Sequence, residues 1–164
     1  MILYHGSDVI VEDPRIIRSD NGRDFGFGFY TTDIKEQAVR WAQRKARMTM
    51  RKKQLYTPFV SVYEFDESAF DRLKYKRFDE PSLDWLDMVC ICRSDMNYVH
   101  GYDIVSGKIA NDNVGETVMY VINGIMRRED AVERLKFEKI NNQICFNTEA
   151  ALTYLRYIGY EDHR

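Results

Sequence analysis

The sequence lacks any hydrophobic run that approaches the roughly 20 residues a helix needs to cross a bilayer. Its N-terminus has neither the basic segment nor the apolar segment of a secretory signal. Only three cysteines are present, and two of them are separated by a single residue, so the pattern does not predict a disulfide framework. We therefore expect a cytoplasmic protein with no membrane partner.

Proline and glycine are also scarce, at three and nine residues, which argues against long flexible linkers. The 164 residues are enough for one domain with a core of its own, and 45% of them are hydrophobic and 30% charged. We expect a single globular domain over residues 1–164. The formal net charge of −2 gives no overall attraction to nucleic acid or to anionic membranes.

Two common phosphate-binding motifs are missing. Gly26-Phe27-Gly28 lacks the third glycine of a dinucleotide-binding fingerprint, and no P-loop is present. Cys90, Cys92 and His100 do not have the usual zinc-ligand spacing, and neither cysteine has an activating neighbour. We expect buried structural thiols and no metal.

The hydrophobic pattern predicts strands and helices without a regular βαβ alternation, which is typical of the α+β class. The strands are expected at 2–5, 59–65, 73–78, 102–110 and 143–146. The helices are expected at 33–53, 83–90, 114–126, 128–135 and 149–155, with caps at Asp33, Ser82, Thr148 and Gly159. The second of these helices is expected to turn Leu83, Leu86, Val89 and Cys90 inward.

Residues 25–33, Phe-Gly-Phe-Gly-Phe-Tyr-Thr-Thr-Asp, combine aromatic rings with two glycines. Glycine permits close backbone approach and positive φ, and the rings supply stacking area, which suits a flat aromatic ligand. The alternative is a tight hairpin or bulge whose phenylalanines are buried. The following helix has seven basic residues and no acidic one between Arg40 and Lys53. This run fits either a site for a phosphate-bearing or acidic partner or a solvated helix face.

Three segments together resemble the NAD-binding signature of the ADP-ribosyltransferase fold, in its diphtheria-toxin and poly(ADP-ribose)-polymerase branch. They are His5-Gly6-Ser7, residues 25–33 with Trp41 beyond them, and the start of a late strand at Gln143. More narrowly, the chain resembles a small bacterial family of uncharacterised proteins related to these transferases. That family shares Leu-Tyr-His-Gly-Ser, Phe-Gly-x-Gly-Phe-Tyr-Thr-Thr, the strand over 103–110 and Gln-Ile-x-Phe.

The resemblance implies a split β-sheet core with flanking helices and a site for NAD. It implies that Gly6 offers its peptide group to the nicotinamide carboxamide and that Tyr30 and Trp41 sandwich the ring. His5 and Ser7 would bind ribose hydroxyls or the carboxamide. The NAD-binding set that it implies is His5, Gly6, Ser7, Phe29, Tyr30, Ala38 and Trp41, and the catalytic set is His5, Tyr30 and Gln143.

The chain departs from the diphtheria-toxin and poly(ADP-ribose)-polymerase signature at Gln143, where that branch has a glutamate. Cleavage of the nicotinamide–ribose bond builds positive charge at the anomeric carbon, as glycoside cleavage does. A neutral amide can bind a ribose hydroxyl but cannot supply the stabilising negative charge. Glu149 is close in sequence and is a candidate substitute, although an acidic residue is also favoured there by the helix dipole.

The activity implied is mono-ADP-ribosyl transfer from NAD to a protein or nucleic acid, in the setting of a bacterial toxin or defence effector with an antitoxin-like partner. Two alternatives stay open. One is hydrolysis of NAD, and the other is a degenerate module that binds NAD or ADP-ribose without cleaving it.

Overall fold

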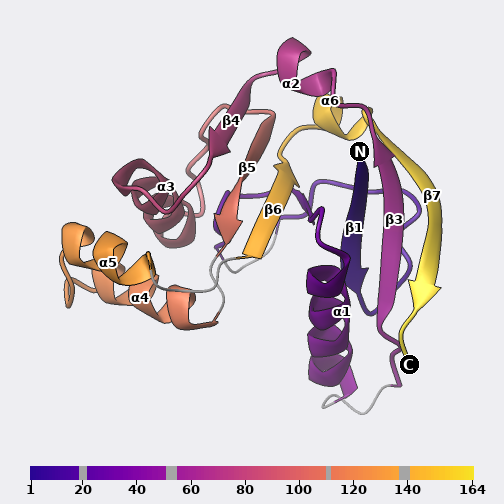
Figure 1. Ribbon diagram of the computed structural model, residues 1–164, viewed down its shortest axis with the longest axis horizontal. Coiled ribbons are helices and arrows are strands. Elements are labelled where there is room, and N and C mark those ends of the chain that lie inside the picture. The colour runs from indigo at the N-terminus through magenta and orange to yellow at the C-terminus, as the bar shows by residue number, and fades with distance from the viewer. Residues whose placement is uncertain (19–21, 51–54, 110–111, 137–140) are drawn as a thin grey trace.

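The computed structural model describes residues 1–18, 22–50, 55–109, 112–136 and 141–164. Its strands form two sheets of the α+β class, as predicted (Figure 1). The first sheet is antiparallel and has the order β1 (Ile2–Ser7), β3 (Phe59–Phe65), β7 (Leu155–Asp162). The second has the order β2 (Phe29–Thr31), β6 (Asn141–Phe146), β5 (Ile104–Ile109), β4 (Tyr75–Phe78), and only its β4–β5 pair is parallel.

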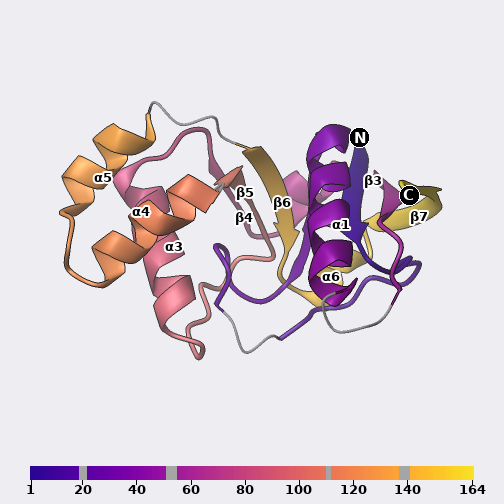
Figure 2. The same cartoon turned by 90° about the horizontal axis from the view of Figure 1, so that it is seen from below.

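The helices fall into separate groups around these sheets (Figures 1 and 2). A cluster at one end of the molecule contains α3 (Leu83–Ser94), α4 (Asp112–Ile122) and α5 (Arg128–Leu135). Helix α1 (Lys35–Met50) packs on the first sheet, and the short α2 (Ala69–Arg72) and α6 (Glu149–Leu152) lie together at the opposite end of the strands from the α1 C-terminus. The predicted end of α1 at residue 53 lies outside the described residues.

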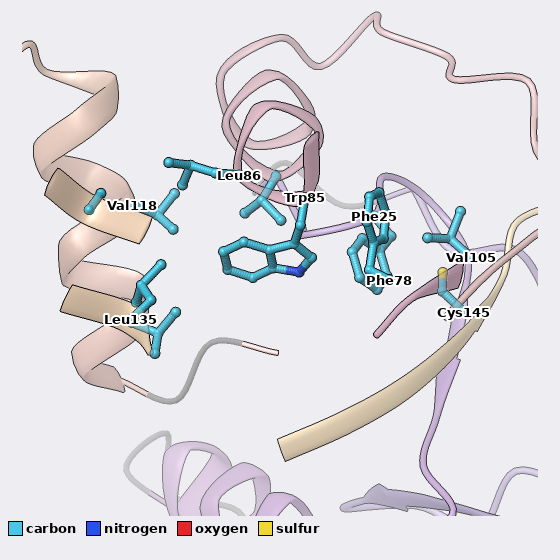
Figure 3. Packing of buried hydrophobic residues seen from close by; sticks show 11 residues of the cluster. Phe25, Phe78, Trp85, Leu86, Val105, Val118, Leu135 and Cys145 are labelled. Carbon is cyan, nitrogen blue, oxygen red and sulfur yellow. The ribbon is translucent and has the colours of Figure 1, made fainter. Parts of the chain in front are cut away.

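The larger core surrounds Trp85 of α3, which is completely buried (Figure 3). Leu86 of the same helix, Val118 of α4 and Leu135 of α5 belong to this cluster. Burying an indole of this size removes a large apolar area from water, which accounts for the packing of three helices at one point.

The inward face of α3 differs from the prediction. Ser82 caps the helix as expected, because its hydroxyl accepts the Trp85 N–H at 3.1 Å. Leu83, however, is 39% exposed and Cys90 is only half-buried, while Trp85 and Cys92 take buried positions. The apolar residues of this helix are spread around most of its circumference, so periodicity alone did not identify the buried side.

A second core joins the two sheets. It contains fully buried rings from three strands, including Phe29 of β2, Tyr63 of β3 and Phe146 of β6. The Phe29 and Tyr63 rings meet edge to face with centroids 5.6 Å apart, a favourable aromatic geometry.

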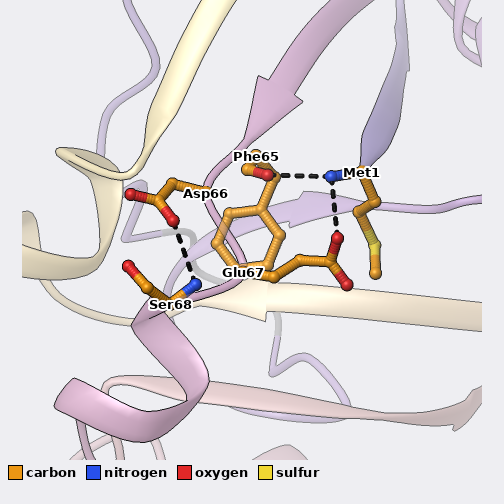
Figure 4. A network of polar contacts seen from close by, with 5 residues as sticks. All are labelled: Met1, Phe65, Asp66, Glu67 and Ser68. Carbon is orange, nitrogen blue, oxygen red and sulfur yellow. Dashed lines mark hydrogen bonds and ion pairs between the residues drawn. The ribbon is translucent and has the colours of Figure 1, made fainter.

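The beginning of β1 is held at the end of β3 (Figure 4). The Met1 amino group donates to the Phe65 carbonyl at 2.9 Å and to the Glu67 carboxylate at 3.1 Å. Asp66 accepts the Ser68 N–H at 3.0 Å, which stabilises the turn that follows β3.

The C-terminal segment is a strand where a helix was predicted over 149–155. Thr148 caps α6 as expected, accepting the Ala151 N–H at 3.3 Å, but α6 ends at Leu152. Strand β7 follows, and Gly159 lies within it at φ +152°, next to a register shift in β3, rather than at a helix end. Pairing with β3 outweighs local helix propensity here, because the partner strand is distant in sequence.

Glycine at position 6 is required by the packing of α1 on β1. A Cβ on Gly6 would lie 1.9 Å from the Ala38 carbonyl oxygen and 2.8 Å from the Ala42 nitrogen. Both are backbone atoms of α1, so the strand and helix would have to separate.

We therefore expect Gly6→Ala to lower the free energy of unfolding by at least about 2 kcal/mol in urea titrations. Gly115→Ala is the matched control, because a Cβ there meets only Arg93 side-chain atoms at 3.5 Å or more. The control should be neutral or up to about 1 kcal/mol more stable, since alanine favours a helix over glycine. Equal stability of the two variants would contradict this packing.

Candidate functional site

A cavity of about 910 Å³ lies between β1, β2, the start of β6 and α1. Its wall brings together seven of the eight residues predicted for the NAD site: His5, Gly6, Ser7, Phe29, Tyr30, Trp41 and Gln143. Ala38, the eighth, is not among the lining residues. It is fully buried and lies beneath Gly6.

The cavity forms where the two sheets separate. Tyr4 of β1 and Thr32 exchange backbone hydrogen bonds of 2.8 and 3.0 Å, which is an isolated antiparallel bridge. If this pairing continued, Gly6 would face Tyr30, but each of these strands pairs on its other side with a different sheet. The separation leaves the facing edge of β1 open beyond the bridge.

The peptide group of Gly6 points to this open edge. Backbone groups in a strand alternate in direction, and those of Tyr4 point away from β3 because they bond to Thr32. Those of Gly6, two residues on, therefore point the same way. A donor and an acceptor are thus directed to the cavity side of β1, a pair that matches the two hydrogen-bonding groups of a primary amide.

His5 spans the separation between the sheets. Its Nδ1–H donates to the Tyr30 carbonyl at 2.7 Å, and its ring lies 4.5 Å from the Phe29 ring. Burial above all, together with the nearby positive charges of Arg23 and Lys45, lowers the pKa of the His5 imidazole to about 4, against the opposing effect of the carbonyl hydrogen bond. The ring is therefore neutral at pH 7. With Nδ1 carrying the proton, Nε2 is left as an acceptor.

The aromatic-glycine stretch forms a loop that is held by hydrogen bonds from the side chain of Asn147, which is distant in sequence. Gly26 has φ +77°, as the pattern suggested, while Gly28 is needed for close approach, because a Cβ there would lie 2.6 Å from the Phe146 carbonyl oxygen. The Asn147 amide donates to the carbonyls of Phe25 and Phe27 at 2.8 and 2.9 Å. Phe25 and Phe29 are buried, as the hairpin interpretation predicted, and Phe29 and Tyr30 of the same stretch border the cavity.

Tyr30 presents its ring to the cavity while its hydroxyl is used inside the loop. The hydroxyl donates to the Gly26 carbonyl and accepts the Phe25 N–H at 3.1 Å. Burial raises the pKa of this hydroxyl well above its usual value, so it does not exchange protons near pH 7. Tyr30 therefore offers a stacking surface and not an acid or base. Trp41 on α1 borders the same cavity.

Gln143 has an unused donor. The side chain is 3% exposed, and its buried Nε2 has no hydrogen-bond partner in the part of the chain that the structure describes. Leaving a buried amide donor unpaired costs about 1–3 kcal/mol, and no described residue offsets this cost at Gln143. The backbone beside it is fixed by Gln37 of α1, whose side chain donates to the Asn142 carbonyl at 2.6 Å and accepts its N–H at 3.0 Å.

The charged residues of the wall divide into paired and unpaired groups. Asp24 is 5% exposed and accepts the Arg93 Nε–H at 2.7 Å, and Asp13 pairs with Arg15 at 3.3 Å. Arg23 and Lys45 form no ion pair among the residues that the structure describes. Asp8 accepts hydrogen bonds from Ser7 and Thr49 hydroxyls.

The zinc alternative finds no support. His100 uses both ring nitrogens within the protein: Nδ1 accepts the Tyr102 N–H at 3.0 Å, and Nε2 donates to the Phe25 carbonyl at 3.0 Å. No cluster of potential metal ligands occurs among the described residues. Burial raises the pKa of the Cys90 thiol, and that of Cys92 to about 12, as expected for inert structural thiols.

Several residues of the site were missed from sequence. Arg23, Lys45 and Asp8 line the cavity, and Gln37 and Asn147 position its wall. Lys45 belongs to the basic run between Arg40 and Lys53 but was not assigned to the NAD site. The contacts of Gln37 and Asn147 are long-range, so no local pattern indicated those two residues. Glu149, suggested as a substitute carboxylate, is exposed on α6 and is not among the lining residues.

The neutral His5 predicts a pH effect on stability. Between pH about 6.5 and about 4 the unfolded chain binds a proton at this position and the folded chain does not. The free energy of unfolding should therefore fall as pH is lowered through this window, by up to about 3 kcal/mol. His5→Gln should show a smaller fall in denaturant titrations at pH 7 and 4.5. His163→Gln changes a histidine outside the cavity wall, and its free energy of unfolding should fall by as much as that of the wild type. Parallel curves for all three proteins would contradict the assignment.

Comparison with known proteins gives a family without an assigned activity. No curated protein and no solved structure matches the chain. Across the described residues, no helix has the length and apolar character needed to cross a membrane. A family model described as "Protein of unknown function (DUF3990)" matches residues 1–157, nearly the whole chain. The chain belongs to the DUF3990 family of proteins of unknown function.

Proposed function

We propose that the cavity binds NAD and that the protein is a mono-ADP-ribosyltransferase, which transfers ADP-ribose from NAD to a protein or nucleic acid. One observation carries the proposal. Residues from β1, β2, α1 and β6 that match the ADP-ribosyltransferase signature border a single cavity, and a buried donor of Gln143 at its wall lacks a partner. The proposal does not depend on any one short motif.

The residues present fit the nicotinamide end of NAD. The peptide group of Gly6 would pair with the carboxamide, and the Tyr30 and Trp41 rings would hold the pyridinium ring. A pyridinium carries positive charge, so aromatic faces suit it better than they suit a neutral ring. Nε2 of His5 is suited to accept a hydrogen bond from a hydroxyl group, and Nε2 of Gln143 is suited to donate one to a hydroxyl oxygen. These two groups are suited to fixing a ribose.

NAD supplies a nicotinamide leaving group whose departure builds positive charge on the ribose. The protein would orient the nicotinamide and ribose rings, and the buried Phe29 would exclude water from its side of the cavity. Both His5 and Gln143 are neutral, so neither gives the charge stabilisation that a glutamate would. We therefore propose slow turnover. NAD hydrolysis is the related outcome if no acceptor is bound.

A second candidate is a module that binds NAD or ADP-ribose without cleaving it. It is favoured by the neutral Gln143 together with the position of Glu149 outside the cavity wall. Both candidates place the ligand at the same residues, and they differ only in whether the bond breaks.

We place this activity in the cytoplasm, in a toxin or defence effector with an antitoxin-like partner. The acceptor would dock beside the cavity on the basic side of α1. Arg40 and Arg47 are exposed on this helix, and Arg40 also donates to the Asn141 side chain at 3.1 Å. Cations spaced along one helix suit a partner that carries phosphates or carboxylates.

An assay of nicotinamide release from labelled NAD tests the proposal. Wild type should release nicotinamide above background, and His5→Ala and Gln143→Ala should each release it about ten-fold or more slowly, because each removes a ribose contact. Arg47→Ala, changed outside the cavity wall, serves as a control for cleavage of free NAD.

The outcomes separate the candidates. Absence of release in every variant, with NAD binding retained, would reject the enzyme and leave the binding module. Release without transfer of label to lysate would favour the hydrolase. Absence of both binding and release would reject the proposed function.

Restoring the carboxylate gives an independent prediction. Gln143→Glu places a hydrogen-bond acceptor and a negative charge where the ADP-ribosyltransferase signature has its glutamate. Nicotinamide release should therefore rise by about ten-fold or more at pH 7–8. Asn142→Asp, one residue earlier on the same strand, controls for a negative charge added outside the cavity wall. A Gln143→Glu protein that binds NAD but is no faster than wild type would contradict the role assigned to this position.

A further inference from the structure

The cavity extends beyond the residues that fit nicotinamide and ribose, and two cations border it without an anionic partner. Arg23 lies in the loop before β2, and Lys45 lies on α1, one turn beyond Trp41. Both side chains are exposed. Among the described residues neither forms an ion pair, in contrast to Arg15 and Arg93, which pair with Asp13 and Asp24.

The two cations lie beside the groups assigned to the ring and the ribose. The Arg23 guanidinium is 5.5 Å from the centre of the Tyr30 ring. Lys45 is four residues after Trp41, so the two side chains lie on the same side of α1. Both charges also lie near enough to His5 to lower the pKa of its imidazole. Two cations without an ion-pair partner therefore lie next to the neutral His5, and Asp8, which accepts hydrogen bonds from the Ser7 and Thr49 hydroxyls, borders the same cavity.

We propose that Arg23 of the loop before β2 and Lys45 of α1, both at the cavity wall, form a diphosphate subsite, so that the ligand class is a dinucleotide or a nucleoside diphosphate sugar rather than a nucleoside. This inference rests on the proposed function, because the nicotinamide end fixes which side of the ligand meets the cations. A guanidinium binds phosphate oxygens in a bidentate manner, and an ammonium acts as a point charge on them. Two unpaired cations match the two negative charges of a diphosphate.

The inference also explains the present position of Arg23. Its guanidinium contacts the Tyr30 ring, which is the surface assigned to nicotinamide. When a ring stacks there, Arg23 has to leave that face, and a diphosphate attached to the same ligand gives it a stronger partner than the ring. Aromatic stacking and diphosphate binding are then coupled through one side chain.

Calorimetric titration with three ligands tests the subsite: NAD, ADP-ribose, and nicotinamide riboside, which lacks the diphosphate. Arg23→Gln and Lys45→Gln should each weaken NAD and ADP-ribose by about ten-fold, the effect of one charge-assisted hydrogen bond. Affinity for nicotinamide riboside should stay within about two-fold of wild type in Lys45→Gln and should not fall in Arg23→Gln, where no guanidinium has to leave the Tyr30 ring. The salt dependence of NAD binding should become shallower in both variants.

Arg72→Gln is the control, since Arg72 is exposed on α2 and does not line the cavity. It should bind all three ligands as wild type does, and thermal melts should show that every variant is folded. Unchanged affinity for ADP-ribose in the Arg23→Gln/Lys45→Gln double variant would overturn the subsite and leave the proposed function standing. An equal loss for nicotinamide riboside would also overturn it. No binding of any ligand by wild type would overturn the proposed function and the subsite together.

Discussion

The hydrogen bond from His5 to the Tyr30 carbonyl holds the two sheets at the point where they separate. A continuous sheet would pair Gly6 with Tyr30 and leave no site. Instead, one bridge at Tyr4 and Thr32 ends the pairing, and a side chain replaces the next backbone contact. This substitution keeps β1 and β2 together while leaving the peptide group of Gly6 open to a ligand. It also requires a neutral imidazole, because the ring is enclosed between Phe29 and the strand.

Helix α1 and the aromatic-glycine loop complete the site from either side of this separation. The helix approaches β1 so closely that only glycine fits at position 6, and it carries Trp41 and Lys45 to the cavity. The loop is held by Asn147 and by the Tyr30 hydroxyl. Recognition groups are therefore rigidly placed, while the group expected to carry charge, Gln143, is neutral. Under the proposed function, the residues suited to binding NAD are present, and the negative charge that a glutamate would supply at position 143 is absent.

Features governed by neighbouring residues were predictable from the sequence. The caps at Ser82 and Thr148 and the helix over 128–135 follow from local hydrogen bonding and periodicity, and the structure confirms them. The buried side of α3 and the presence of strand β7 were not predictable, because partners that are distant in sequence determine both. The same holds within the site. The motif residues were recognisable by type, but Gln37, Asn147 and the unpaired cations act through contacts across the fold.

Gln143 is the residue on which the account can be tested most directly. A crystal structure with NAD or ADP-ribose bound should place a ribose hydroxyl within hydrogen-bond distance of Gln143 Nε2, with the Tyr30 ring against the nicotinamide pocket. A ligand bound elsewhere, or a Gln143 amide that remains without a partner in the complex, would contradict the central claim that this cavity is an NAD site.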